Sequence, residues 1–125
     1  MVAGRRQRRG HVAHLAGLMA EEGVRGHYIA AGATPLASRW RGQSGEIDLI
    51  FRQDDELIFV EVKKAANHAL AAQRLSVSQM HKICQTACEF CESLGHDSLT
   101  PMRFDVALVD SLGRIDVIAN AFGSY

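Results

Sequence analysis

The chain has 125 residues, of which 47% are hydrophobic and 22% are charged. This length and composition predict one globular domain with a substantial core, and they exclude an intrinsically disordered chain. No apolar run approaches the roughly 20 residues that a membrane-spanning helix needs, and the basic start lacks the apolar stretch of a secretory signal, so we expect no membrane partner. The three cysteines, an odd number, argue against a disulfide framework and favour the reducing cytoplasm.

The formal net charge is zero, but the charges are unevenly distributed along the chain. Residues 1–41 carry seven arginines and two glutamates, whereas residues 42–62 carry one arginine and six acidic residues. Basic regions attract phosphates, and clustered carboxylates attract divalent cations. The alternative interpretation is a solvated basic arm beside an ordinary acidic hairpin.

The first predicted element is a helix over residues 9–22, preceded by a basic, flexible arm over residues 1–8. Its apolar face is formed by Val12, Leu15, Ala16 and Met19. We expect Gly23 to end this helix. The apolar residues 27–33 then predict a first strand, and residues 36–41 predict an edge strand or a loop.

A hairpin is predicted next, because residues 46–51 and 57–62 are strand-like and flank a polar turn over residues 52–55. The remaining predicted elements are a helix over residues 78–94 with Ser78 as its N-cap and Gly95 as its end, a strand over residues 104–109, and a short strand or helical turn over residues 114–119. This order predicts an α/β fold with a central mixed β-sheet flanked by helices, in a single domain over residues 9–125.

The most informative feature of the sequence is charge within an apolar strand. Residues 57–63 read Leu-Ile-Phe-Val-Glu-Val-Lys, which predicts a central strand covered on both faces. Glu61 and Lys63 are two residues apart, so they share one face of this strand. On the preceding strand Glu46 and Asp48 also share a face, and an aligned hairpin would bring Asp48 opposite Glu61. Burying such charges is costly, which indicates a buried ion pair or a functional site.

Two carboxylates a few ångströms apart repel each other, and a hard cation such as Mg²⁺ or Mn²⁺ relieves this repulsion. We therefore expect Asp48 and Glu61 to hold the cation, with the backbone carbonyl of Val62 as a further oxygen ligand. Lys63 would position or help deprotonate a water and would stabilise the charge that develops on a phosphate. This set predicts phosphodiester hydrolysis with Asp48, Glu61 and Lys63 as catalytic residues. The alternative is a simple surface ion pair between Glu61 and Lys63.

The same residues carry a resemblance to a known family. Residues 45–50, Gly-Glu-Ile-Asp-Leu-Ile, followed by residues 57–63, resemble the paired motifs of the YraN-like family of small bacterial proteins. The resemblance continues in Arg39-Trp40-Arg41, Arg103-Phe104-Asp105-Val106 and Ile118-Ala119-Asn120-Ala121-Phe122. It covers nearly the whole chain, from about Arg9 to Phe122.

This resemblance implies a restriction-endonuclease-like fold with the PD-(D/E)xK core shared by Holliday-junction resolvases. It also implies nucleic-acid binding, with Asp48 as the motif aspartate and Glu61 and Lys63 as the E-x-K. The family's first helix usually starts Arg-x-Gly-Glu, and its glutamate completes the acidic site. Here the sequence is Arg9-Gly10-His11, so His11 is expected where that glutamate would stand. His11 would then ligate a softer metal, contact a phosphate when protonated, or mark a weakened activity.

Other side chains are expected around this site. Glu46 and Gln79 are its expected neighbours, although a solvent-exposed position is the alternative for Gln79. The residues expected to contact nucleic acid are the basic side chains Arg5, Arg6, Arg8, Arg9, Arg39, Arg41, Lys64 and Lys82. Trp40 would stack on a base or, in the interpretation we favour, lie in the core.

Three cysteines lie on the second predicted helix at Cys84, Cys88 and Cys91. Their spacing would allow a metal site, but they fall on an apolar stripe, and a free cysteine behaves as a small buried hydrophobe. We therefore expect them in the core.

Three functional hypotheses follow from the sequence. The first is a metal-dependent nuclease that acts on DNA, with branched or damaged structures in repair or recombination as its candidate substrates. The second is a nucleic-acid-binding protein that keeps the nuclease fold without cleavage. The third is an interaction module whose E-x-K is a structural ion pair. A homodimer would suit cleavage of both strands of a symmetric junction.

Overall fold

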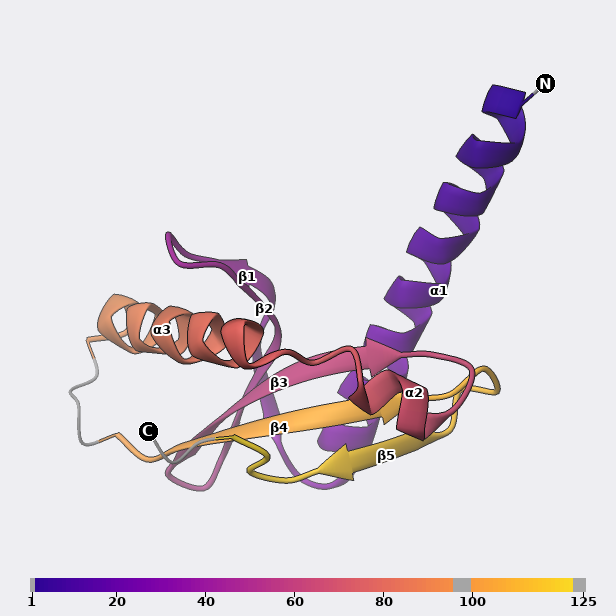
Figure 1. Ribbon diagram of the computed structural model, residues 1–125. Coiled ribbons are helices and arrows are strands. Elements are labelled where there is room, and N and C mark those ends of the chain that lie inside the picture. The colour runs from indigo at the N-terminus through magenta and orange to yellow at the C-terminus, as the bar shows by residue number, and fades with distance from the viewer. Residues whose placement is uncertain (1, 96–99, 123–125) are drawn as a thin grey trace.

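Residues 2–95 and 100–122, which the computed structural model describes, fold around a five-stranded β-sheet (Figure 1). The strands are β1 (Thr34–Arg41), β2 (Glu46–Gln53), β3 (Glu56–Lys64), β4 (Met102–Val109) and β5 (Ile115–Ile118). The helices are α1 (Val2–Ala30), α2 (His68–Ala72) and α3 (Val77–Ser93). None of the helices within these residues has the length and apolar character needed to cross a membrane.

The strands lie in sequence order from β1 to β5, so β3 is the central strand and β1 is at an edge. Three neighbouring pairs are antiparallel, and only β3 and β4 run parallel among the described strands. A parallel pair needs a crossover connection, and α2 and α3 lie in it. The predicted hairpin, edge strand and central strand are confirmed. The fold is α/β, a mixed sheet with flanking helices, and it is consistent with the restriction-endonuclease-like class.

Alternate residues of β3 face two different cores. Leu57 and Phe59 belong to a cluster with α3, whereas Ile58 and Val60 belong to a cluster with α1. Each of these four side chains is at most 1% exposed. Burial on both faces explains why this strand is apolar throughout. The strand then becomes partly exposed at residues 62–64, which include Lys63 and Lys64, whereas Glu61 is still buried.

α1 begins earlier than the sequence predicts. It starts at Val2, where a flexible arm was expected over residues 1–8 and a helix only from residue 9. The backbone of residues 2–8 is therefore helical, and the first half of α1 extends away from the sheet (Figure 1). Side chains are described from residue 15 onward. The expected nucleic-acid contacts of the first arginines lie outside the described side chains and stay predictions: Arg5, Arg6, Arg8 and Arg9.

α1 also ends later than predicted, at Ala30, so the predicted strand over residues 27–33 is wrong. The buried side chains in this part of the helix are Ala20, Val24 and Tyr28. They recur every four residues and form an apolar stripe that runs past Gly23, whereas Leu15 and Met19 of the predicted apolar face are exposed. A glycine inside a helix costs only about 1 kcal/mol relative to alanine, and the packing of this stripe offsets that cost. The chain turns instead at Gly32, which has a φ of 97°.

α3 lies close to its predicted position over residues 78–94. Its N-cap is Ser76 rather than Ser78, because the Ser76 hydroxyl accepts a hydrogen bond of 3.1 Å from the backbone N–H of Gln79. Gly95, with a φ of 74°, follows the end of the helix as expected. α2 was not predicted, since its five residues are too few to show a helical period.

The side chains of α3 and β1 pack on the sheet largely as expected. Cys91 is buried and Cys84 is half-buried, but Cys88 is exposed, so the predicted core position is wrong for Cys88. All three are free thiols. Trp40 is half-buried and lies edge-on against Phe90, with 5.3 Å between the ring centroids. This agrees with a core role for Trp40 rather than stacking on a base.

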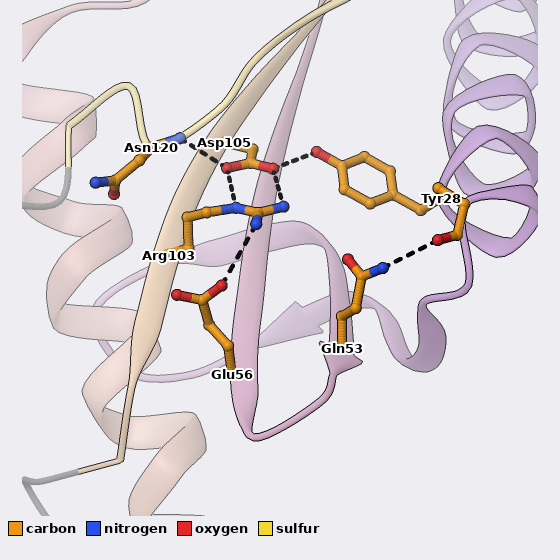
Figure 2. Close-up of polar contacts among 7 residues, drawn as sticks. Tyr28, Gln53, Glu56, Arg103, Asp105 and Asn120 are labelled. Carbon is orange, nitrogen blue, oxygen red and sulfur yellow. Dashed lines mark hydrogen bonds and ion pairs between the residues drawn. The ribbon is translucent and has the colours of Figure 1, made fainter.

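A buried polar network fixes α1 to the sheet, and Asp105 of β4 is its centre (Figure 2). Asp105 is 0% exposed and accepts hydrogen bonds from the Tyr28 hydroxyl at 2.6 Å, from the Arg103 guanidinium at 2.9 and 3.0 Å, and from the backbone N–H of Asn120 at 2.8 Å. Arg103 also contacts Glu56 at 3.4 Å. Burial, and then the contact with Asp105, raise the pKa of Tyr28 above its ordinary value, so its hydroxyl stays protonated.

Two further contacts hold the end of α1 in place. The Tyr28 ring stacks on Phe51 of β2, with 4.6 Å between the centroids. The side-chain amide of Gln53 donates a hydrogen bond of 2.9 Å to the carbonyl of Ala31 (Figure 2). Together with the Asp105 network, they set the position of α1 relative to β2 and β3.

Candidate active site

Asp48 and Glu61 meet at one end of the β2–β3 hairpin. The paired residues of these strands run as far as Leu49 and Val60, and continuing this register by one residue places Asp48 opposite Glu61. Here the Asp48 carboxylate accepts a hydrogen bond of 2.8 Å from the backbone N–H of Val62. The structure therefore brings the two carboxylates together, as an aligned hairpin predicts.

The position of Glu61 changes its protonation. Glu61 is 6% exposed, and burial raises its pKa from 4.5 to about 9, with further contributions from the hydrogen bond and charge of Asp48. The ammonium of Lys63 lies 3.8 Å from Glu61 Oε1 and acts in the opposite direction. The Lys63 side chain is 15% exposed. In the absence of a cation, burial and the neighbouring Asp48 therefore favour the protonated form of Glu61, and Lys63 opposes them.

The raised pKa of Glu61 predicts a specific pH dependence of stability. Between pH 4.5 and about 9, Glu61 is more protonated in the folded than in the unfolded chain. The free energy of unfolding therefore falls as the pH rises through this range. Glu61→Gln removes this contribution. We expect the variant to gain stability relative to the wild type as the pH rises, in urea denaturation series at several pH values in EDTA.

Glu22→Gln, at an exposed position on α1, is the control for the lost carboxylate. If the difference in unfolding free energy between wild type and Glu61→Gln is the same at every pH in this range, the expectation is contradicted.

Glu61 also borders a cavity between the sheet and the beginning of α3. This cavity has a volume of about 370 Å³, and its polar lining residues are Glu46, Glu61, Ser76, Ser78, Gln79 and Lys82. Gln79 and Glu46, expected as neighbours of the site, therefore line the same cavity as Glu61, and so does Lys82. The solvent-exposed alternative for Gln79 does not hold, since this residue is half-buried.

Glu21 of α1 is a neighbour of this site that sequence analysis did not single out. Its carboxylate accepts hydrogen bonds of 2.9 and 3.3 Å from the Arg39 guanidinium. Its negative charge also contributes to the raised pKa of Glu61. A third carboxylate therefore acts on the site from α1.

The resemblance placed the first-helix residue of the site at His11, whereas Glu21 is the residue of α1 that acts on Glu61. His11 precedes Glu21 by ten residues, roughly 15 Å along a helix, and its side chain lies outside the described part of the chain. Glu21 is thus the α1 carboxylate that the structure describes near the site, and the expected role of His11 stays a prediction. Helical spacing is the signal that could have found it, because Glu21 is three and seven residues before the buried Val24 and Tyr28.

The remaining basic residues expected to contact nucleic acid differ in their partners. Arg39 and Arg41 form ion pairs with glutamates at 2.9 and 3.4 Å, and both arginines are exposed. Lys64 is half-buried and Lys82 is exposed, and neither forms an ion pair within the described residues. Lys64 and Lys82 are thus the two of these four cations that are free to meet a phosphate.

The oxygen donors at this site match the chemistry of a hard cation. Asp48 and Glu61 supply two adjacent carboxylates, and Mg²⁺ commonly binds through one or two carboxylates while keeping several waters. The described residues contain no group of three or more histidine, cysteine or acidic side chains placed to hold a metal ion. The donor set is therefore compatible with Mg²⁺ or Mn²⁺, and it lacks the ligands of a structural zinc site.

Comparison with known proteins places the chain in a family. A sequence model of the family described as "Uncharacterised protein family UPF0102" matches residues 20–109. The chain belongs to this family. The YraN-like resemblance is thereby confirmed, and the match includes β2, β3, β4 and the Glu21 region of α1.

Close relatives cover almost the full length of the chain. A UPF0102 protein of Cereibacter sphaeroides is 52% identical over 115 residues, which is 92% of this chain and 98% of the relative. A UPF0102 protein of Ruegeria pomeroyi is 49% identical over 115 residues, 92% of this chain and 94% of the relative. A UPF0102 protein of Roseobacter denitrificans is 46% identical over 112 residues, 90% of this chain and 87% of the relative.

Proposed function

We propose that this chain binds nucleic acid and hydrolyses DNA phosphodiester bonds with the help of Mg²⁺ or Mn²⁺. The observation that carries the proposal is the convergence of Asp48, Glu61 and Lys63 at adjacent strand ends, beside a cavity that Glu61 borders. Two carboxylates and a lysine in such a place are costly to bury, and a cation and a phosphate would offset that cost.

Asp48 and Glu61 are the residues that would hold the cation. When bound, the cation would neutralise phosphate charge and lower the pKa of a bound water. The Val62 N–H fixes the Asp48 carboxylate, so its oxygens are already oriented without substrate. This preorganisation favours binding, since the Asp48 side chain does not have to be ordered at that step.

Lys63 is suited to act on the phosphate and the attacking water. Its ammonium is held 3.8 Å from Glu61 and borders open space on its other side. There it would donate hydrogen bonds to a phosphate oxygen or position the attacking water, and only its neutral amine form could accept a proton from that water. Glu21 and Arg39, paired on the α1 side, would keep a negative and a positive group near the Asp48–Glu61 pair.

A nuclease assay tests this proposal. Purified protein is incubated with linear duplex, single-stranded and four-way DNA, with Mg²⁺, Mn²⁺ or EDTA. We expect cation-dependent cleavage, with branched DNA as the favoured substrate if the family's kinship with junction resolvases extends to activity. Lys63→Gln should lower kcat by on the order of 10²-fold, the lower range for a proton-transfer or charge-stabilising group.

Arg52→Gln is the matched control for Lys63→Gln, because it removes one exposed positive charge toward the other end of β2. It should cleave like the wild type. Equal cleavage by wild type and Lys63→Gln would exclude Lys63 from the reaction. No cleavage of any substrate with either cation would contradict the proposed activity.

A second candidate function is nucleic-acid binding without cleavage. It is favoured by the Glu61–Lys63 contact, because a protonated Glu61 beside Lys63 can also be a stable structural pair. The same assay separates the two functions. Binding of four-way DNA that persists while cleavage is absent under all conditions would support this second function.

A further inference from the structure

A second hollow lies beside the candidate active site, and it is lined by Lys63 but not by Glu61. Its volume is about 580 Å³, and its lining residues come from α1, the end of β3 and the segments after β3, α2 and β4. We call it the basic groove. Its charged residues are Lys63, Lys64 and Arg74. Because Lys63 also contacts Glu61 at 3.8 Å, the basic groove adjoins the two carboxylates.

Among the side chains that the structure describes, every charged one that lines the basic groove is positive. Within the described residues, the side chains of Lys64 and Arg74 form no hydrogen bond or ion pair. Cations that share a hollow without carboxylates concentrate positive potential there, and this potential attracts an anion. The charge of the groove therefore fits a phosphate-bearing ligand.

The other walls of the basic groove leave room for such a ligand. They are formed mainly by small residues: Ala16, Gly17, Ala65, Ala66 and Ser111. A Cβ atom added at Gly17 would meet nothing within 4 Å, so the α1 wall is open at this point. Short side chains on both sides allow a polymer backbone to approach the cations directly.

We propose that the basic groove binds the DNA backbone next to the phosphodiester that is hydrolysed, with Lys64 and Arg74 contacting neighbouring phosphates. This inference rests on the proposed function and adds the path of the substrate. A DNA strand that has one phosphate at Asp48 and Glu61 would pass Lys63 and continue into the groove. Arg74 was not among the expected nucleic-acid contacts, since no strand or helix pattern placed it beside Lys63.

The test measures how DNA affinity depends on salt. Affinity for a fluorescein-labelled duplex is followed by fluorescence anisotropy in EDTA, for wild type, Lys64→Gln, Arg74→Gln and the double variant. Each lost phosphate contact should reduce the slope of log affinity against log salt by about 0.9. When the salt is raised from roughly 50 to 200 mM, the factor by which affinity falls should therefore be about three times smaller for each single variant than for the wild type. Arg52→Gln, which removes an exposed arginine outside the groove, should keep the wild-type slope.

The outcomes separate this inference from the proposed function. If the wild type binds DNA and both groove variants keep the slope of Arg52→Gln, the groove is not a phosphate site, whatever the cleavage assay gives. If a labelled RNA duplex titrated in parallel shows the change in slope and the DNA duplex does not, the groove is not a DNA site. A wild type without affinity even at low salt would overturn both proposals. In cleavage assays the groove variants should raise KM and leave kcat near the wild-type value. Arg74 is exposed, so it can be changed without disturbing the core.

Discussion

Asp105→Ala should lower the free energy of unfolding by about 3–5 kcal/mol, because it removes the acceptor from a buried charged network. Asp105 is 0% exposed and accepts hydrogen bonds from Tyr28, Arg103 and Asn120 (Figure 2). Its loss leaves the Tyr28 hydroxyl and the Arg103 guanidinium without their shared partner, and it frees the segment after β5. Urea denaturation followed by circular dichroism measures the change.

Two variants calibrate this experiment. Tyr28→Phe removes only one neutral donor and should cost about 1–2 kcal/mol. Asp55→Ala removes an exposed carboxylate in the β2–β3 turn and should change stability by less than about 0.5 kcal/mol. If Asp105→Ala costs no more than Asp55→Ala, the network contributes no net stability and α1 is held by its other contacts.

Asp48→Asn should abolish cation-dependent cleavage, with a loss of roughly 10³-fold or more in kcat/KM, the upper range for removal of one electrostatic group. The reason is the loss of a negative charge beside Glu61, where the proposed cation needs both carboxylates. The amide oxygen of asparagine can still accept the hydrogen bond from the Val62 N–H, so the hairpin should keep its structure. The measurement is the cleavage rate of four-way DNA with Mg²⁺ and with Mn²⁺.

Asp55→Asn is the matched control for Asp48→Asn, since it makes the same chemical change at an exposed turn position. It should cleave as fast as the wild type. Cleavage by Asp48→Asn at the rate of Asp55→Asn would show that Asp48 has no part in the reaction, and any observed activity would then come from another site.

The sequence predicted the central part of the fold well because its pattern is local. The apolar run from Leu57 to Val60 could only be a strand buried on both faces, and the polar turn before it specified an antiparallel partner. Once the hairpin register is aligned, the encounter of Asp48 with Glu61 follows from it. These two residues were therefore accessible from sequence alone.

The position of α1 was less accessible. Gly23 suggested a helix end, but the buried stripe that includes Val24 and Tyr28 depends on packing against β2 and β3. Such tertiary contacts outweigh the local preference of one glycine. The error at Gly23 also hid Glu21, because a helix that ends at Gly23 does not point to a carboxylate two residues before its end as a site residue.

Long-range contacts set the remaining features. Asp105 reads as one acid in an apolar strand, and nothing nearby in the sequence indicates that its partner is Tyr28, which lies 77 residues away. Arg74 likewise reaches the basic groove only because the crossover after β3 returns past the end of that strand. The sequence could place Lys63 at the site, but not the cations that lie beside it.

Cation binding is the most direct test of the central claim, that two neighbouring strand ends form a carboxylate site for a hard cation. Isothermal titration calorimetry with Mg²⁺ and Mn²⁺ would be carried out on wild type, Asp48→Asn and Asp55→Asn without DNA. We predict that wild type and Asp55→Asn bind with the same affinity and that Asp48→Asn binds far more weakly. Equal affinity of Asp48→Asn and wild type, or no binding by the wild type, would contradict the claim.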